Sequence, residues 1–170
     1  QERPVPASTI PGEQASPTQP VPVKPPPLAQ LALSRTDLST ITPEAASFCR
    51  EQWDRLGLKD TRVFTPPGLT GPNLMLPANY GGAGGVWGGV AIDPRTGTIF
   101  TNIANMASYN YIRKAKDPSD PSAVAGYKVE SAYTKFLDQN GLPCIHPPWG
   151  EMVAIDGNKG EIVWRRPLGE

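Results

Sequence analysis

Residues 149–164 read WGEMVAIDGNKGEIVW, and a similar stretch, WGGVAIDPRTG, occupies residues 87–97. In both stretches a short alternating apolar run reaches an aspartate, Asp93 or Asp156, and a glycine follows shortly afterwards. Aspartate accepts backbone N–H bonds in tight turns and glycine takes a positive φ, so each stretch predicts a strand, a turn and a second strand. A strand pair that recurs along a chain indicates a repeat fold, and the blades of a β-propeller are built from such pairs.

The second stretch contains the pattern Ala154-x-Asp156-x-x-x-Gly160-x-x-x-Trp164. This pattern resembles the tryptophan-docking repeat of the quinoprotein dehydrogenases, in which the tryptophan of each blade packs against the next blade. Further stretches resemble the membrane-bound glucose dehydrogenase branch of that family, which uses pyrroloquinoline quinone (PQQ): QASPTQP at 14–20, FTPP at 64–67, WGG at 87–89, GLPC at 141–144 and PPWG at 147–150. The resemblance implies an all-β fold: a partial β-propeller of about two blades from an eight-bladed ring, with one inserted helix and long irregular loops.

The composition favours a portion of a propeller over a complete one. Only 38% of the 170 residues are apolar, and the chain holds 21 prolines and 17 glycines, so its core is expected to be small. Prolines concentrate near the start, and residues 1–41 are predicted to form an extended connection between blades. Basic and acidic residues number 16 each, and this balance predicts neither a nucleic-acid partner nor an anionic membrane surface.

The strongest helix signal covers residues 42–57. Thr42 suits the N-cap, Pro43 the first helical position and Glu44 the positive end of the helix dipole. Gly57 provides a stop. Between them, five residues recur at helical spacing and indicate a packing face: Ala45, Phe48, Cys49, Trp53 and Leu56.

The remainder, residues 58–170, is predicted to hold the propeller-blade segments, interrupted by a long loop at about 102–140 that shows no regular pattern. A loop of this length is unusual in a packed domain. Within it, the run YNYIRK at 109–114 is interpreted either as a binding rim or as a solvated excursion.

The two cysteines, Cys49 and Cys144, stand far apart, and His146 is the sole histidine, so the chain has too few ligands to predict a zinc site. The resembling glucose dehydrogenases carry cysteine in the same segments and act in the periplasm. The resemblance therefore implies a disulfide between Cys49 and Cys144. Two buried free thiols remain the alternative, because spacing alone does not fix connectivity.

The resemblance also implies one cofactor contact, at Asn102. Its position after Asp93-Pro94 matches an asparagine that contacts the quinone in the family, and it is expected to close the strand that begins at Thr98. Trp87 and Trp149 are two further candidates, either as rings that stack on the planar quinone or as packing between blades. No catalytic residue and no metal ligand is predicted, and His146 is interpreted as a structural or surface imidazole.

The predicted function is that of a fragment of a PQQ-dependent sugar or alcohol dehydrogenase, with glucose as the favoured substrate, that passes electrons to ubiquinone. By resemblance, the Ca²⁺ ligands, the catalytic aspartate and a lysine near the quinone belong to other blades, and the parent enzyme is periplasmic and attached to the inner membrane. The remaining blades are the expected partners of the chain, which by itself should be inactive and self-associate through its strand edges. The alternative is a non-catalytic propeller segment with a binding or scaffolding role.

Overall fold

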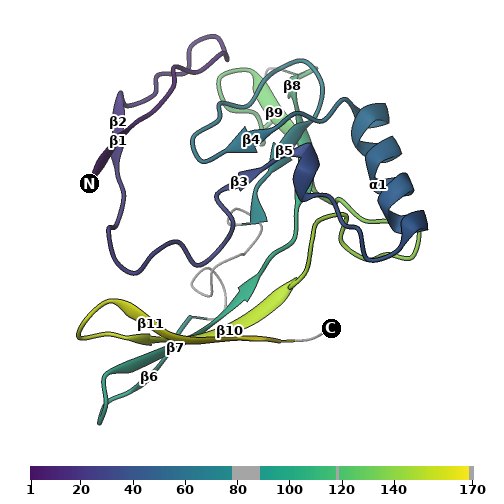
Figure 1. Cartoon of the computed structure of the whole chain (residues 1–170). Helices are drawn as coiled ribbons and strands as arrows, with labels where there is room; N and C mark the ends of the chain where they lie inside the picture. The colour runs from purple at the N-terminus through teal and green to yellow at the C-terminus, as the bar shows by residue number, and fades with distance from the viewer. Residues whose placement is uncertain (78–88, 118, 169–170) are drawn as a thin grey trace.

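The computed structural model describes residues 1–77, 89–117 and 119–168. In this part of the chain most of the regular structure is β-strand, arranged in separate open sheets, and there is one α-helix. Figure 1 shows the largest sheet on one side of the molecule and the helix on the other. The predicted combination of many strands with a single inserted helix is therefore confirmed.

All the strand pairs are antiparallel. Two sheets are two-stranded: β1 (Glu2–Pro4) pairs with β2 (Thr18–Pro20), and β3 (Ala32–Leu33) pairs with β4 (Thr61–Arg62). A three-stranded sheet has the order β5 (Asn73–Met75), β8 (Ser108–Lys114), β9 (Tyr127–Lys135). A four-stranded sheet has the order β11 (Glu161–Pro167), β10 (Gly150–Asp156), β7 (Thr98–Ala104), β6 (Ala91–Asp93). The helices are the 3₁₀ turn η1 (Arg35–Asp37) and α1 (Pro43–Leu56).

Both sequence repeats lie in the four-stranded sheet. Each folds as predicted into two strands joined by a tight turn, β6–β7 for the first repeat and β10–β11 for the second. Gly97 donates its N–H to the carbonyl of Asp93 (2.8 Å), Gly160 donates to that of Asp156 (2.7 Å), and both glycines have positive φ. Because β7 also pairs with β10, the two repeats form one meander, which residues 105–149 interrupt in the middle.

The turns of the two repeats touch each other. Gly157 donates its N–H to the carbonyl of Gly97 (3.0 Å), and the side-chain amide of Asn158 donates to the carbonyl of Thr96 (3.3 Å). A Cβ at position 157 would lie 2.7 Å from the Gly97 oxygen, which is closer than Cβ atoms come in real structures. Glycine at position 157 is therefore needed for the two turns to approach.

Helix α1 begins and ends where the sequence predicts. The Thr42 hydroxyl accepts the N–H of Ala45 (3.1 Å), and Gly57 ends the helix with a φ of 70°. On the inner face Cys49 and Trp53 are buried, and the Trp53 ring packs against Phe136 at a centroid distance of 6.2 Å. No helix in the described ranges is long and apolar enough to cross a membrane.

Two apolar cores hold these elements together. The first packs α1 against β3 and the ends of the three-stranded sheet; its buried members are Leu33, Leu38, Cys49, Trp53, Leu58, Leu76, Ala107, Phe136, Cys144 and Ile145. The second lies against one face of the four-stranded sheet, where Ile103, Val153 and Ile155 pack with Leu28 and Ala29 from the N-terminal segment. Each core therefore joins residues that are far apart in the sequence.

Most of the proline-rich residues 1–41 are exposed, but they also make specific contacts. They form the β1–β2 hairpin, and their later part lies along the four-stranded sheet. Lys24 pairs with Glu161 (Nζ to Oε1, 3.1 Å), and the Arg165 guanidinium donates to the carbonyl of Leu28. The segment thus packs as a strap across the sheet.

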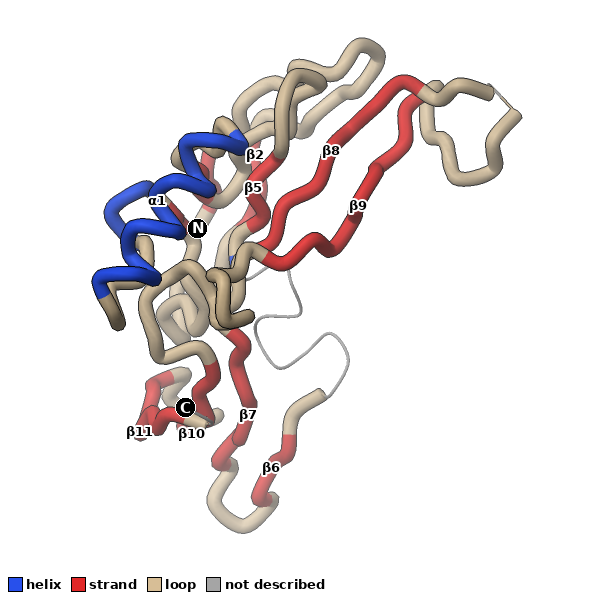
Figure 2. Tube along the Cα trace, turned by 90° about the vertical axis from the view of Figure 1, so that its right-hand side faces the viewer, coloured by secondary structure: helices blue, strands red, loops and turns tan. Residues whose placement is uncertain are grey.

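The predicted long loop at about 102–140 is wrong. β7 continues to Ala104, and β8 and β9 form a long hairpin, which Figure 2 shows beside β5. Most residues of β8 are partly exposed, so the strand lacks the apolar alternation of a half-buried strand. A register shift between Tyr109 and Tyr111 further disrupts the period of two that the sequence pattern would need.

A disulfide joins Cys49 in α1 to Cys144, which lies in the segment that leads into β10. Both residues are fully buried in the first core, and they are 95 positions apart in the sequence. This bond connects the helix to the far end of residues 105–149, close to the point where the chain returns to the four-stranded sheet.

We expect Gly157→Ala to lower the free energy of unfolding by about 1–3 kcal/mol, because the added methyl group forces the two turns apart. Urea unfolding followed by circular dichroism measures the change. Gly68→Ala is the matched control: a Cβ there meets nothing nearer than 4.0 Å, so stability should change by no more than about 0.5 kcal/mol. Equal effects of the two substitutions would contradict the role assigned to the turn contact.

We expect the double variant Cys49→Ala, Cys144→Ala to lose about 3–5 kcal/mol of stability, because the disulfide closes a long loop in the unfolded chain. Reduced wild-type protein, unfolded in parallel, should be similarly destabilised. Titration of the denatured but unreduced wild type should detect no reactive thiol. Finding both thiols reactive would instead support the alternative of two free cysteines.

Candidate functional site

Asn102 lies within β7, two residues before the strand ends at Ala104. The prediction that Asn102 closes this strand is wrong, because pairing with β10 continues as far as Ala104 and Gly150. The residue is exposed, and its backbone carbonyl accepts the Thr101 hydroxyl at 3.4 Å. Its side-chain amide makes no hydrogen bond to another described residue, which leaves both its donor and its acceptor open to a ligand.

The face of the sheet that carries Asn102 also carries aromatic side chains. Directly opposite residues of paired strands share a face, and Phe100, Ala154 and Trp164 form such a row. The Phe100 and Trp164 ring centroids lie 6.1 Å apart, and Ala154 between them is fully buried. Both rings are partly exposed, so this row presents an aromatic surface.

The other predicted site residues lie elsewhere. Trp149 packs against the first core, and its indole N–H donates to the carbonyl of Ile145 (2.8 Å), which favours a packing role over stacking on a ligand. Trp87 lies outside the described residues. His146 is exposed, and its backbone N–H bonds to the carbonyl of Asp37 (3.0 Å).

The two repeat aspartates are turn residues, as the sequence indicates. The backbone N–H of Arg95 and then its guanidinium lower the pKa of Asp93. Burial acts to raise the pKa of Asp156, but the backbone N–H groups of Asn158 and Lys159 outweigh it, and the pKa is lowered. Both carboxyl groups are thus held ionised as hydrogen-bond acceptors within their turns, and a lowered pKa makes them poor general bases.

A polar cluster on the opposite face of the sheet was not recognised from the sequence. Glu151, whose side chain is 12% exposed, pairs with Arg165 (Oε1 to Nε, 3.6 Å) and accepts the side-chain N–H of Asn105 (3.3 Å). Asn105 also donates to the carbonyl of Pro148 (3.2 Å). The cluster clamps the end of β7 to the start of β10. The sequence does carry a signal for this cluster. Side chains alternate between the two faces along a strand, and Glu151 falls on the same face as the buried residues Val153 and Ile155.

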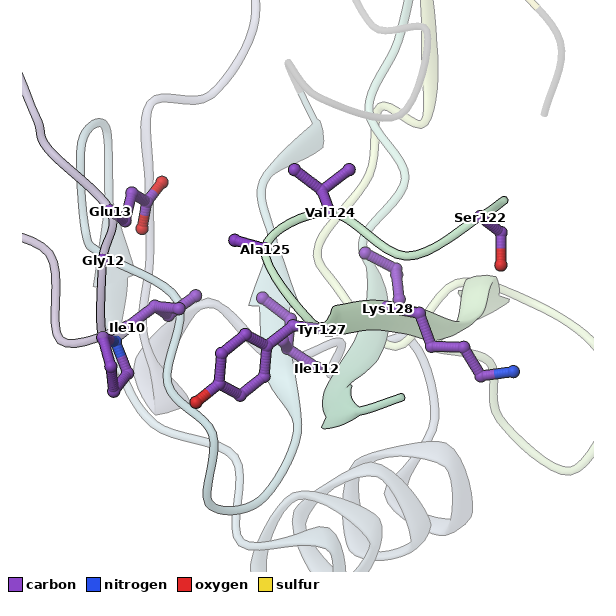
Figure 3. Close-up of a pocket in the computed structure, with 11 residues that line it drawn as sticks. Ile10, Gly12, Glu13, Ile112, Ser122, Val124, Ala125, Tyr127 and Lys128 are labelled. Atoms are coloured by element: carbon purple, nitrogen blue, oxygen red, sulfur yellow. The ribbon is translucent and has the colours of Figure 1, made fainter. Parts of the chain in front are cut away.

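A cavity of about 330 Å³ lies between the N-terminal segment and the far end of the β8–β9 hairpin. Figure 3 shows Ile10, Ile112 and Tyr127 gathered in it, while the Lys128 ammonium points away. Lys128 instead pairs with Asp120 at 3.4 Å. Asn102 does not line this cavity, whose walls are mostly apolar, so the cavity is separate from the predicted cofactor contact.

Metal ligands do not gather in the ranges 1–77, 89–117 and 119–168: no three histidine, cysteine, aspartate or glutamate side chains there are placed to hold an ion. The geometry thus offers two kinds of functional surface. One is the aromatic row, suited to packing against another unit, and the other is the open amide of Asn102 beside it.

The chain is similar to known proteins along its whole length. The family model for PQQ, glucose/ethanol/alcohol dehydrogenase, β-propeller domain, matches residues 1–170. Over 99% of its length the chain is 33% identical to the glycerol dehydrogenase large subunit of Gluconobacter oxydans, 30% to the quinate/shikimate dehydrogenase (quinone) of Acinetobacter baylyi and 29% to the quinoprotein glucose dehydrogenase of Escherichia coli. No solved structure matches it significantly.

The chain spans 25% of the length of the glycerol dehydrogenase subunit and 22% of each of the other two relatives. Its strand-rich, unclosed sheets are those of a partial propeller, as predicted from the repeats. Because the family model covers every residue, the chain belongs to the PQQ family of glucose/ethanol/alcohol dehydrogenase β-propeller domains.

Proposed function

We propose that this chain is part of the propeller of a PQQ-dependent dehydrogenase that oxidises a sugar or other alcohol, with glucose as the first substrate to test. The observation that carries the proposal is the match of the whole chain to the PQQ propeller family. The named relatives act on glycerol, quinate or shikimate, and glucose, all of which carry several hydroxyl groups. The name of the Acinetobacter baylyi relative contains the word quinone, which supports ubiquinone as the electron acceptor.

The open amide of Asn102 fits a quinone cofactor. An amide N–H donates to a quinone oxygen, and this bond strengthens as negative charge develops there. When bound, PQQ supplies the redox chemistry by accepting the electrons removed from the substrate. Asn102 would hold and orient the cofactor, and the neighbouring Phe100–Trp164 row would pack against an adjacent blade.

The buried Cys49–Cys144 disulfide supports a periplasmic location, because disulfides persist in oxidising compartments. Attachment to the inner membrane and a Ca²⁺ ion in the site are parts of the same proposal, and both would come from regions of the enzyme outside this chain. A complete protein that binds PQQ but oxidises no alcohol would favour the scaffolding alternative.

We expect Asn102→Ala in the complete enzyme to lower PQQ affinity or turnover about ten- to a hundredfold, the value of one or two hydrogen bonds. The thermal unfolding temperature should stay near that of wild type, because the side chain is exposed. Gln139→Ala, which removes another exposed amide, is the control and should change neither property. Wild-type kinetics and wild-type PQQ affinity in Asn102→Ala would show that this residue does not contact the cofactor.

We expect Trp164→Ala to have the opposite effect. If the ring docks onto a neighbouring blade, its loss should cost the complete protein about 3–5 kcal/mol of stability, as for buried aromatic residues. Enzyme that still folds should keep near-normal PQQ affinity. Urea unfolding and equilibrium dialysis measure the two properties, and unchanged stability would mean that no blade covers this ring.

A further inference from the structure

The tight turn before Cys144 carries an asparagine followed by a glycine. Asn140 is the one asparagine of the sequence that precedes a glycine. Asn140 and Gly141 are both exposed, and they lie at the tip of a short hairpin in which Leu137 pairs with Pro143. Glycine has no Cβ, so the Gly141 side of this peptide bond is unhindered and the Asn140 side chain can reach the backbone nitrogen that follows it.

Asp138 holds this turn closed with its side chain and its backbone. Its Oδ1 atom accepts the backbone N–H of Asn140 (2.8 Å) and that of Leu142 (2.9 Å). The Asp138 carbonyl accepts the N–H of Gly141 (3.1 Å), and the Asp138 N–H donates to the carbonyl of Leu142 (2.7 Å). The nitrogen of Gly141 is therefore engaged in the folded turn, and it becomes free to react only when the turn opens locally.

We propose that Asn140 is a deamidation site of this protein and that Asp138 sets the rate of the reaction. When the turn opens, hydroxide removes the proton of the Gly141 amide, and the nitrogen attacks the side-chain carbonyl carbon of Asn140. The new N–C bond closes a succinimide ring, and the side-chain nitrogen takes a proton from water and leaves as ammonia. Water then opens the ring at either carbonyl, which gives aspartate or isoaspartate at position 140. Nothing is oxidised or reduced.

Both products disfavour the original turn. Each adds a carboxylate close to that of Asp138, and like charges at short range repel each other. Isoaspartate also lengthens the main chain by a methylene group, so the bonds to Asp138 can no longer all form. The turn leads directly to Cys144, and its opening loosens the segment that the disulfide ties to α1.

The test is incubation of the complete protein in mildly alkaline buffer, followed by proteolysis and mass spectrometry. We expect Asn140 to show the gain in mass that accompanies replacement of an amide NH₂ by a hydroxyl group. Asn158, which is exposed but precedes a lysine, is the control and should react far more slowly. Asp156, which also precedes a glycine, can form isoaspartate only without a change in mass, so the mass gain is specific to asparagine.

Variants of Asp138 test its control of the rate. Asp138→Ala removes the acceptor of two turn N–H groups and should raise the rate at Asn140 about tenfold. Asp138→Asn keeps an acceptor oxygen and should react at nearly the wild-type rate. Hydrogen exchange of the Gly141 amide measures the opening of the turn directly and should rise in step with the rate of deamidation.

The outcomes decide both parts of the proposal. Folded protein that shows no mass gain at Asn140 would overturn the assignment of the site. Equal rates in wild type and Asp138→Ala would overturn the role of Asp138. Should Asp138→Ala not fold, the wild type still decides, because urea must then accelerate the reaction at Asn140 by releasing the turn. Equal rates in folded and urea-unfolded wild type would contradict control by the turn.

Discussion

The pairing of β7 with β10 is the contact on which the rest of this structure depends. An isolated two-stranded hairpin is marginally stable in water, and each sequence repeat forms only such a pair. Joining β7 to β10 converts two pairs into a four-stranded sheet and brings Ile103, Val153 and Ile155 together in the second core. The same register sets Asn102 opposite Met152 and brings the turns of the two repeats into contact.

This pairing requires residues 105–149 to leave the end of β7 and return to the start of β10. Closing so long a loop costs conformational entropy, which the insertion offsets by packing Ala107, Phe136, Cys144 and Ile145 into the first core together with α1 and β3. At the returning end, Cys144 is bonded to Cys49 of α1, and the carbonyl of Cys144 accepts the N–H of Ser39 (2.9 Å). The Trp149 indole then bonds back to Ile145, which fixes the entry into β10.

The two faces of the four-stranded sheet have different uses. One packs against the N-terminal strap and holds the partly buried Glu151–Arg165 pair, so it is occupied within this chain. The other carries partly exposed aromatic rings beside an open amide and an exposed arginine. Large apolar side chains left partly in water are typical of surfaces that meet another unit, which agrees with a chain that covers about a quarter of its relatives.

The sequence alone determined the local features whose causes lie within a few residues. These include the Thr42 cap and Gly57 stop of α1, and the Asp-to-Gly turns of both repeats. It did not reveal the β8–β9 hairpin, because partly exposed strands with a register shift show no clear period. It also predicted that β7 ends at Asn102, whereas the strand continues for two more residues to Ala104. Only the tertiary structure decided that the two repeats share one sheet, since the pairing of β7 with β10 joins segments separated by residues 105–149. Which face Asn102 occupies, and which side chains stand beside it, follow from that long-range register and not from the neighbours of Asn102 in the chain.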